Sequence, residues 1–172
     1  VGANTYACGT AVKEGVLTLA AGASLPSDQI VRLEGGVLDL GGATQTVLAL
    51  TGTGTVKGGT AQPTDGVYPG GVGTVGALAF QNASVEGKVF VDFAEDGKSC
   101  DGLTFSGAVD LSKVTISFAN PEKIDKSRSF VLLSASVVAG KPVVENCPKG
   151  FMIDVGDDGV KLVRRGLAVI LR

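Results

Sequence analysis

Short apolar runs alternate with turn-forming residues throughout the first sixty positions of the chain. Residues 16–19, 30–33, 37–40 and 47–50 are rich in Val, Leu and Ile, and Gly, Ser, Thr or Asn separate them. Each run is too short for a helix, and the separating residues fall where a strand must turn. Short strands with frequent turns are typical of a β-solenoid, in which each turn of the chain stacks on its neighbour. The pattern therefore predicts a β-solenoid in this part of the chain.

The remainder of the chain also has the pattern of β-structure. Further strands are expected at residues 77–80, 89–93, 104–105, 108–111, 114–118, 129–133 and 143–145. Residues 151–155 and 160–163 flank an Asp-Gly turn and predict a terminal hairpin. Residues 167–171 are continuously apolar, as in a strand buried on both faces, and residues 120–126 could form one helical turn with Asn120 as N-cap. The predicted fold class is all-β.

Charge and glycine content divide the chain into three parts. Residues 1–86 contain 9 charged side chains and residues 87–172 contain 23. Residues 59–75 are rich in Gly and Pro, so we expect a surface loop or a soft boundary there. The predicted organisation is a β-solenoid repeat region (1–58), this loop (59–75), and a β-rich continuation with a C-terminal cap (76–172). Whether the last part continues the solenoid or forms a separate β-sandwich is open.

Composition excludes several classes of partner. The 26 glycines, with aromatic residues at only 5%, fit β-structure with tight corners. The formal net charge is −2, so neither nucleic acid nor an anionic membrane is an expected partner. No apolar run approaches the ~20 residues that a membrane-spanning helix needs. We therefore predict no membrane span.

The N-terminal third resembles the autotransporter-associated β-strand repeat of bacterial surface proteins. The matching elements are Thr5-Tyr6, Cys8-Gly9-Thr10, Val12, Gly15-Val16-Leu17-Thr18-Leu19, Leu38-Asp39-Leu40-Gly41-Gly42, Gln45-Thr46-Val47 and Gly52-Thr53-Gly54-Thr55-Val56. Cys8 stands where such repeats usually have a glycine. The resemblance implies a right-handed parallel β-helix that is exported, with a structural or adhesive role. It supplies no catalytic residues.

Catalytic and metal-binding patterns are sparse. The chain has no His, which removes the usual general base and most zinc sites. Asp92, Glu95, Asp96 and Asp101 form the only dense acidic cluster, for which a calcium site is one interpretation and a solvated charged turn the favoured one. A second group, Asp154 with Asp157 and Asp158, is explained by turn chemistry better than by metal binding. We predict no cofactor, no metal and no enzymatic activity; a carbohydrate-active enzyme is the least favoured class.

The three cysteines leave their pairing open. Cys100 and Cys147 could form a disulfide in an oxidising compartment and leave Cys8 over. The alternative interpretation is three small, buried apolar side chains.

The ends of a solenoid are sheet edges that need either a cap or a partner molecule. The C-terminal hairpin could cap one end, or one subunit could accept the first strands of the next in a head-to-tail filament. Candidate assembly residues are Cys8, Leu167, Val169 and Leu171. The leading hypothesis is a secreted or cell-surface, non-enzymatic structural subunit that forms a homo-oligomer or polymer. The alternative is a passenger-like adhesin module that contacts glycans, with Tyr68 lying in a suitable loop.

Overall fold

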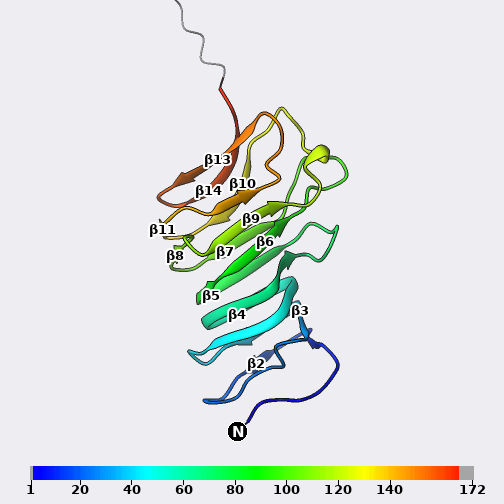
Figure 1. The fold of residues 1–172 in the computed structure, drawn as a ribbon, viewed down its shortest axis with the longest axis vertical. Coiled ribbons are helices and arrows are strands. Elements are labelled where there is room, and N and C mark those ends of the chain that lie inside the picture. The colour runs from blue at the N-terminus through cyan, green and yellow to red at the C-terminus, as the bar shows by residue number, and fades with distance from the viewer. Residues whose placement is uncertain (1, 167–172) are drawn as a thin grey trace, which may run out of the picture.

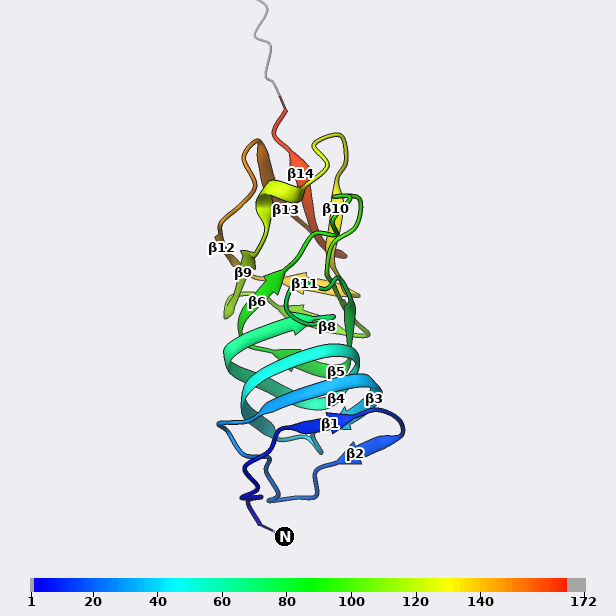
Figure 2. The same cartoon turned by 90° about the vertical axis from the view of Figure 1, so that its right-hand side faces the viewer.

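The computed structural model describes residues 2–166, and the chain over this range is all-β. Strands account for 58% of the residues and helices for 2%. Twelve strands form one mixed sheet that wraps into a nearly closed, barrel-like wall, and two further strands form a small separate sheet (Figures 1 and 2). The predicted all-β class is confirmed.

The described chain consists of strands and one short 3₁₀ helix, which lies between the ninth and tenth strands. In chain order they are β1 (Thr10–Val12), β2 (Val16–Thr18), β3 (Ile30–Asp39), β4 (Thr44–Pro69), β5 (Ala77–Val85), β6 (Gly87–Val91), β7 (Gly102–Phe105), β8 (Ala108–Asp110), β9 (Val114–Phe118), the 3₁₀ turn η1 (Pro121–Lys123), β10 (Phe130–Ser134), β11 (Val137–Ala139), β12 (Val143–Glu145), β13 (Phe151–Gly156) and β14 (Gly159–Arg164).

Most strands pair in parallel with the strand one turn further along the chain. Thus β3 pairs with β4, β4 pairs with β5 and β6, and β6 pairs with β9, all in parallel. Side-chain hydrogen bonds also connect one turn of the chain to the next, and they join residues that are 24, 25 and 27 positions apart in sequence. The exceptions come at the C-terminal end, where β14 pairs antiparallel with both β10 and β13. The mixed character of the sheet therefore comes from the last strands.

The core is built from apolar residues that occupy equivalent positions in successive strands. Leu17 lies opposite Leu38, Leu38 opposite Val56, Val56 opposite Phe80, and Phe80 opposite Phe105. Because residues alternate between the two faces of a strand, these positions all point to the inside of the wall. The last four of them are almost completely buried. Their alignment fixes the register, because a slip by one residue would expose the whole row.

Several strand bounds differ from those predicted, and the largest differences are at two expected breaks. The break expected between residues 33 and 37 is a register shift inside β3, between Glu34 and Val37. Strand β4 is 26 residues long and runs through most of the expected loop at residues 59–75, which leaves the sheet only after Pro69. A straight strand of this length would extend ~85 Å, and Figure 2 shows it bending around the barrel. Glycine in β4 bends the strand without ending it, because pairs such as Gly59 with Ala83 keep the ladder intact.

The later predictions agree well with the structure. The strand at residues 114–118 and that at residues 143–145 have the predicted bounds, and β11 is an additional strand that the pattern did not indicate. The hairpin is confirmed, with Gly156 opposite Gly159 across the turn. The helical turn is confirmed as η1, but the Asn120 side chain bonds to the backbone of Phe93 and does not cap it. The expected strand at residues 167–171 lies outside the described residues.

Candidate functional site

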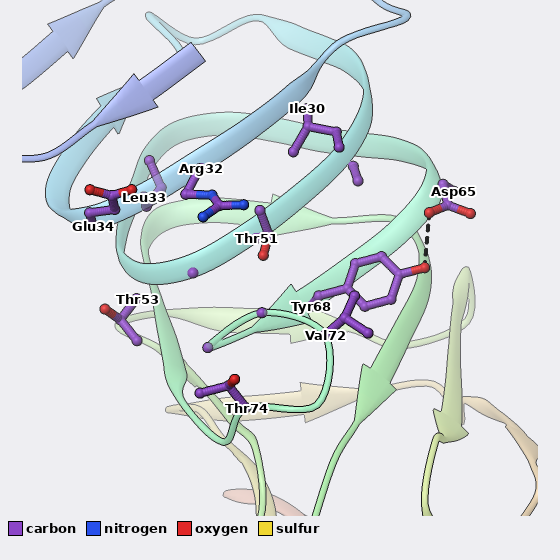
Figure 3. A pocket seen from close by; sticks show the side chains of 14 residues that line it. Ile30, Arg32, Leu33, Glu34, Thr51, Thr53, Asp65, Tyr68, Val72 and Thr74 are labelled. Carbon is purple, nitrogen blue, oxygen red and sulfur yellow. Dashed lines mark hydrogen bonds between the residues drawn. The ribbon is translucent and has the colours of Figure 1, made fainter. Parts of the chain in front are cut away.

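A surface groove of about 620 Å³ lies where the turn after β4 folds back over β3 and β4. Side chains of β3 and β4 that alternate away from the core form its floor, and Arg32 lies opposite Thr51 in the ladder. The end of β4 and the segment 70–74 form its wall. Figure 3 shows side chains from both parts directed toward the same space. The groove is thus formed jointly by strands β3 and β4 and by the segment 70–74 that follows β4.

Tyr68 is held rigidly at one side of the groove. Its ring stacks on Phe90 with a centroid distance of 4.5 Å and an interplanar angle of 5°. Its hydroxyl donates a hydrogen bond of 2.9 Å to Asp65 Oδ2 (Figure 3). Burial, with the hydrogen bond to Asp65 and the charge of that carboxylate, raises the pKa of Tyr68 to about 12. The phenol therefore stays protonated and acts as a fixed, neutral aromatic surface.

Arg32 and Thr51 contribute the polar groups of the floor. Within residues 2–166, neither side chain takes part in a hydrogen bond or an ion pair. The acidic neighbour on the same strand, Glu34, pairs with Lys13 at 3.6 Å and so does not neutralise Arg32. Thr51 is only 8% exposed, yet it lines the groove. Since no buried side-chain polar atom of the described residues lacks a partner, the unpaired Thr51 hydroxyl opens onto the groove, where it and the unpaired guanidinium of Arg32 are available to a ligand.

Glycines allow the segment after β4 to turn back sharply. Gly70, Gly71 and Gly73 have φ of 77°, 110° and 73°, a region that residues with a side chain rarely adopt. A Cβ at Gly70 would lie 2.2 Å from the Thr74 carbonyl oxygen. The Gly70 N–H donates to the Gly52 carbonyl at 2.7 Å, which fixes the segment against the floor. The wall of the groove is therefore specified by backbone geometry.

Two buried carboxylates hold this segment from behind. The Gly73 N–H donates to Asp92 Oδ2 at 2.9 Å, and the Gly76 N–H donates to Asp101 Oδ1 at 2.8 Å. The Asp92 N–H donates in turn to Asp101 Oδ2 at 2.9 Å. Asp92 and Asp101 are 4% and 1% exposed. They form a clamp, which we call the Asp92–Asp101 clamp, between the segment 70–76 and the next turn of the chain.

The carboxyl group of Asp101 in this clamp has a raised pKa. Burial is the main cause that raises the pKa of Asp101 to about 7, and the charge of Asp92 adds to it. The hydrogen bonds from Gly76 and Asp92 act in the opposite direction. The group is thus poised to change charge near neutral pH.

The predicted acidic cluster does not converge on a common point. Asp92 and Asp101 accept backbone hydrogen bonds. Glu95 instead forms an ion pair with Lys123, and Asp96 Oδ2 lies 3.9 Å from Lys98 Nζ. Over residues 2–166, no group of three or more His, Cys, Asp or Glu side chains is arranged to hold a metal ion. The solvated-turn interpretation is wrong for Asp92 and Asp101, because both are buried. The pair at residues 157 and 158 occupies the hairpin turn, as expected.

The cysteines are separated along the molecule. All three are free thiols, so the Cys100–Cys147 disulfide is not formed in the structure. Cys100 is partly buried, and burial is the main cause that raises its pKa to about 12, which makes it a poor nucleophile. Burial also raises the pKa of the partly buried Cys147, whereas Cys8 is exposed near the N-terminal end. Of the other candidate assembly residues, Leu167, Val169 and Leu171 lie outside the described residues.

Sequence reasoning singled out Tyr68 but missed its neighbours in the groove. Alternation in residues 30–34 could have shown that Arg32 points outward. No sequence signal places it in the same groove as Tyr68, because the two side chains line one groove only once β4 has passed around the barrel. Over residues 2–166 the chain is therefore an all-β protein with a barrel-like wall and a groove beside Tyr68 that both polar and apolar groups line.

No protein-family model, curated protein or solved structure matches the chain. Among residues 2–166, no helix has the length and apolar character to cross a membrane.

Proposed function

We propose that the protein is a secreted or cell-surface, non-enzymatic structural subunit that self-associates head to tail through its strand edges. The fold would be a parallel β-helix with a capping hairpin, related to the autotransporter-associated repeats that its N-terminal third resembles. The parallel pairing of most strands and the aligned apolar rows support this proposal.

The N-terminal edge carries the argument. Within the described chain, β1 and β2 each pair with β3 and have no strand on their other side. Val16 in β2 is 60% exposed, and a shallow hollow of about 790 Å³ beside it is lined by apolar side chains including Leu17 and Leu25. An uncovered edge with apolar side chains is a template for another strand.

The opposite end offers a complementary edge. Within residues 2–166, β11 and β12 each have a strand on one side only, and both pairs are parallel. Val137 and Val143 are exposed on these strands. The hairpin of β13 and β14 covers β10, so only part of this end is capped. The occupant we propose is a second copy of this chain, whose β1 and β2 would continue the parallel ladder from β11 and β12.

The apolar segment at residues 167–171 follows β14 in sequence and adds to the proposed contact. Leu167, Val169 and Leu171 would supply apolar surface, and the exposed Cys8 would lie near the junction. In the elongated shape seen in Figure 2, β14 and β1 belong to opposite ends of the molecule. A contact between these two ends would therefore join different copies.

The test is self-association of a variant with a charged edge. Val16→Lys places a charge on the uncovered edge and should raise the concentration needed for assembly by about tenfold or more. The matched control is Leu48→Lys, since Leu48 is 38% exposed on β4, a strand that belongs to neither proposed edge. Sedimentation velocity and negative-stain electron microscopy, with and without reductant, would measure the effect. Uniform single particles of the wild type at every concentration would reject the proposal, as would equal assembly of the two variants.

A further inference from the structure

The groove beside Tyr68 has the chemistry of a ligand site that is separate from the proposed assembly edges. We propose that it binds an acidic saccharide, whose carboxylate pairs with Arg32 while its hydroxyls bond to Thr51 and Asp65 and its ring packs beside Tyr68. This proposal does not depend on self-assembly, because the groove lies on the side of β3 and β4.

Arg32 indicates a ligand with a negative charge. Its guanidinium has no hydrogen bond or ion-pair partner within the described residues, and Figure 3 shows it in the groove above Thr51. A guanidinium binds a carboxylate in a bidentate manner. The groove lining also holds two carboxylates, but Glu34 pairs with Lys13 and Asp65 accepts the Tyr68 hydroxyl. One available guanidinium among these groups matches a single carboxylate better than the several charges of a polyphosphate.

The rest of the lining indicates a ligand with many hydroxyls. Thr51 is more than nine-tenths buried and lines the groove without a hydrogen-bond partner in the described chain. Thr53 and Thr74 add further hydroxyls, and Asp65 keeps acceptor capacity beyond its bond to Tyr68. Hydroxyl and carboxylate groups placed beside an aromatic ring suit the alternating polar and apolar surface of a sugar.

The groove is a poor site for an extended peptide. A peptide strand would need unpaired backbone groups, but β3 is paired with β1 and β2 on one side and with β4 on the other. The part of β4 that forms the floor is itself paired with β3. Recognition there must therefore come from side chains, which favours a small polyhydroxylated ligand over a chain that adds a strand.

The wall of the groove is held ready for binding. Stacking on Phe90 fixes the Tyr68 ring, and the Asp92–Asp101 clamp fixes the segment 70–76. A site whose groups are already ordered loses less conformational entropy when a ligand binds. Its volume of about 620 Å³ is large enough for one or two sugar rings.

The experiment is isothermal titration calorimetry of the full chain with three acidic probes, trigalacturonate, sialyllactose and a hyaluronan tetrasaccharide, and with neutral maltotriose. We expect at least one acidic probe to bind with a Kd below about 10 mM and about tenfold or more tightly than maltotriose. Arg32→Gln should weaken that binding by about tenfold or more, and Thr51→Val, which keeps the side-chain shape, should weaken it by about threefold to tenfold.

The matched control is Arg128→Gln. Arg128 is also exposed but pairs with Asp125 far from the groove, so its loss should leave binding unchanged. Equal weakening by Arg32→Gln and Arg128→Gln would show general charge attraction and overturn the proposal. Absence of binding by all three acidic probes would overturn it as well. Val16→Lys should bind the saccharide normally, so a failure of assembly and a failure of binding are distinguishable.

Discussion

The first turns of the barrel (β1–β4) and the later turns (β5–β14) fill the same kind of wall with different side chains. All seven phenylalanines of the chain lie in or after β5. In the later turns Phe80 stacks on Phe105 at 4.7 Å and Phe93 on Phe118 at 5.9 Å. In the first turns, positions of the same inward row hold Leu38 and Val56.

Close backbone approach at glycine occurs in both parts. A Cβ at Gly52 would lie 2.1 Å from the Leu33 carbonyl oxygen of the neighbouring strand, so only glycine lets these strands approach. In the later turns, a Cβ at Gly159 would lie 2.4 Å from the Leu133 carbonyl oxygen, whereas one at Gly102 would meet no atom within 4 Å. The comparison teaches that the two parts share close backbone approach at some glycines and differ in what fills the interior, which is aliphatic side chains in the first turns and stacked aromatic rings in the later ones.

The largest expected effect tests the aromatic part. Phe80→Ala should lower the free energy of unfolding by about 3–5 kcal/mol, because Phe80 is fully buried and its ring stacks on Phe105. Urea denaturation would measure it. Val131→Ala, at an exposed position, is the control and should stay within about 0.5 kcal/mol of the wild type. A loss of under about 1 kcal/mol in Phe80→Ala would mean that the aromatic row does not hold the later turns together.

The next effect tests the close approach of two strands at a glycine of the first turns. Gly52→Ala should cost about 1–3 kcal/mol, because φ at Gly52 is 97° and the new methyl would press on the Leu33 carbonyl. Gly102→Ala, in the open surroundings of β7, should change stability by less than about 0.5 kcal/mol. Thermal and urea melts would measure the change in stability of both variants. Similar losses in both would show that the close approach of Gly52 to the Leu33 carbonyl is not what requires glycine there.

A pH effect tests the clamp that joins the two parts. The folded pKa of Asp101 is about 7 and its ordinary value is 3.8, so the folded state holds the extra proton between these values. Stability should therefore fall as pH rises from about 4 to about 7, by at most about 1.4 kcal/mol per pH unit. Asp101→Asn should lack this slope and Asp96→Asn, an exposed control, should keep it. Urea melts at pH 4.5, 6.0 and 7.5 would show a parallel response in all three proteins if the clamp does not titrate in this way.

The smallest effect tests the aromatic contact between the two parts. Tyr68 belongs to β4 and Phe90 to β6, and their rings stack. A double-mutant cycle with Tyr68→Ala and Phe90→Ala should give a coupling energy of about 0.5–1.5 kcal/mol. Tyr68→Phe keeps the ring and removes only the bond to Asp65, so it should preserve that coupling. Additive effects of the two alanine substitutions would show that the stack contributes no coupling between the parts.

Much of the fold could be predicted where neighbours in sequence decide the structure. The hairpin at β13 and β14 depends on an Asp-Gly turn between apolar strands, and η1 begins at Pro121, whose ring favours the first position of a helical turn. The length of β4 could not be predicted in this way. Its glycines are typical of a loop when judged alone, and they remain in the strand because β3 and β5 bind it from both sides.

The sequence by itself determined the all-β class, the strands with regular alternation and the hairpin, because these depend on the period of apolar residues and on turn chemistry. The tertiary structure alone decided which strands pair, and so which distant side chains meet. It placed Arg32, Thr51 and Tyr68 in the lining of one groove. It also buried Asp92 and Asp101, which the sequence pattern assigns to an exposed turn, and bonded them to the segment 70–76. The physical reason is that burial and hydrogen bonding depend on which later turn of the chain covers a residue, and no local pattern encodes that.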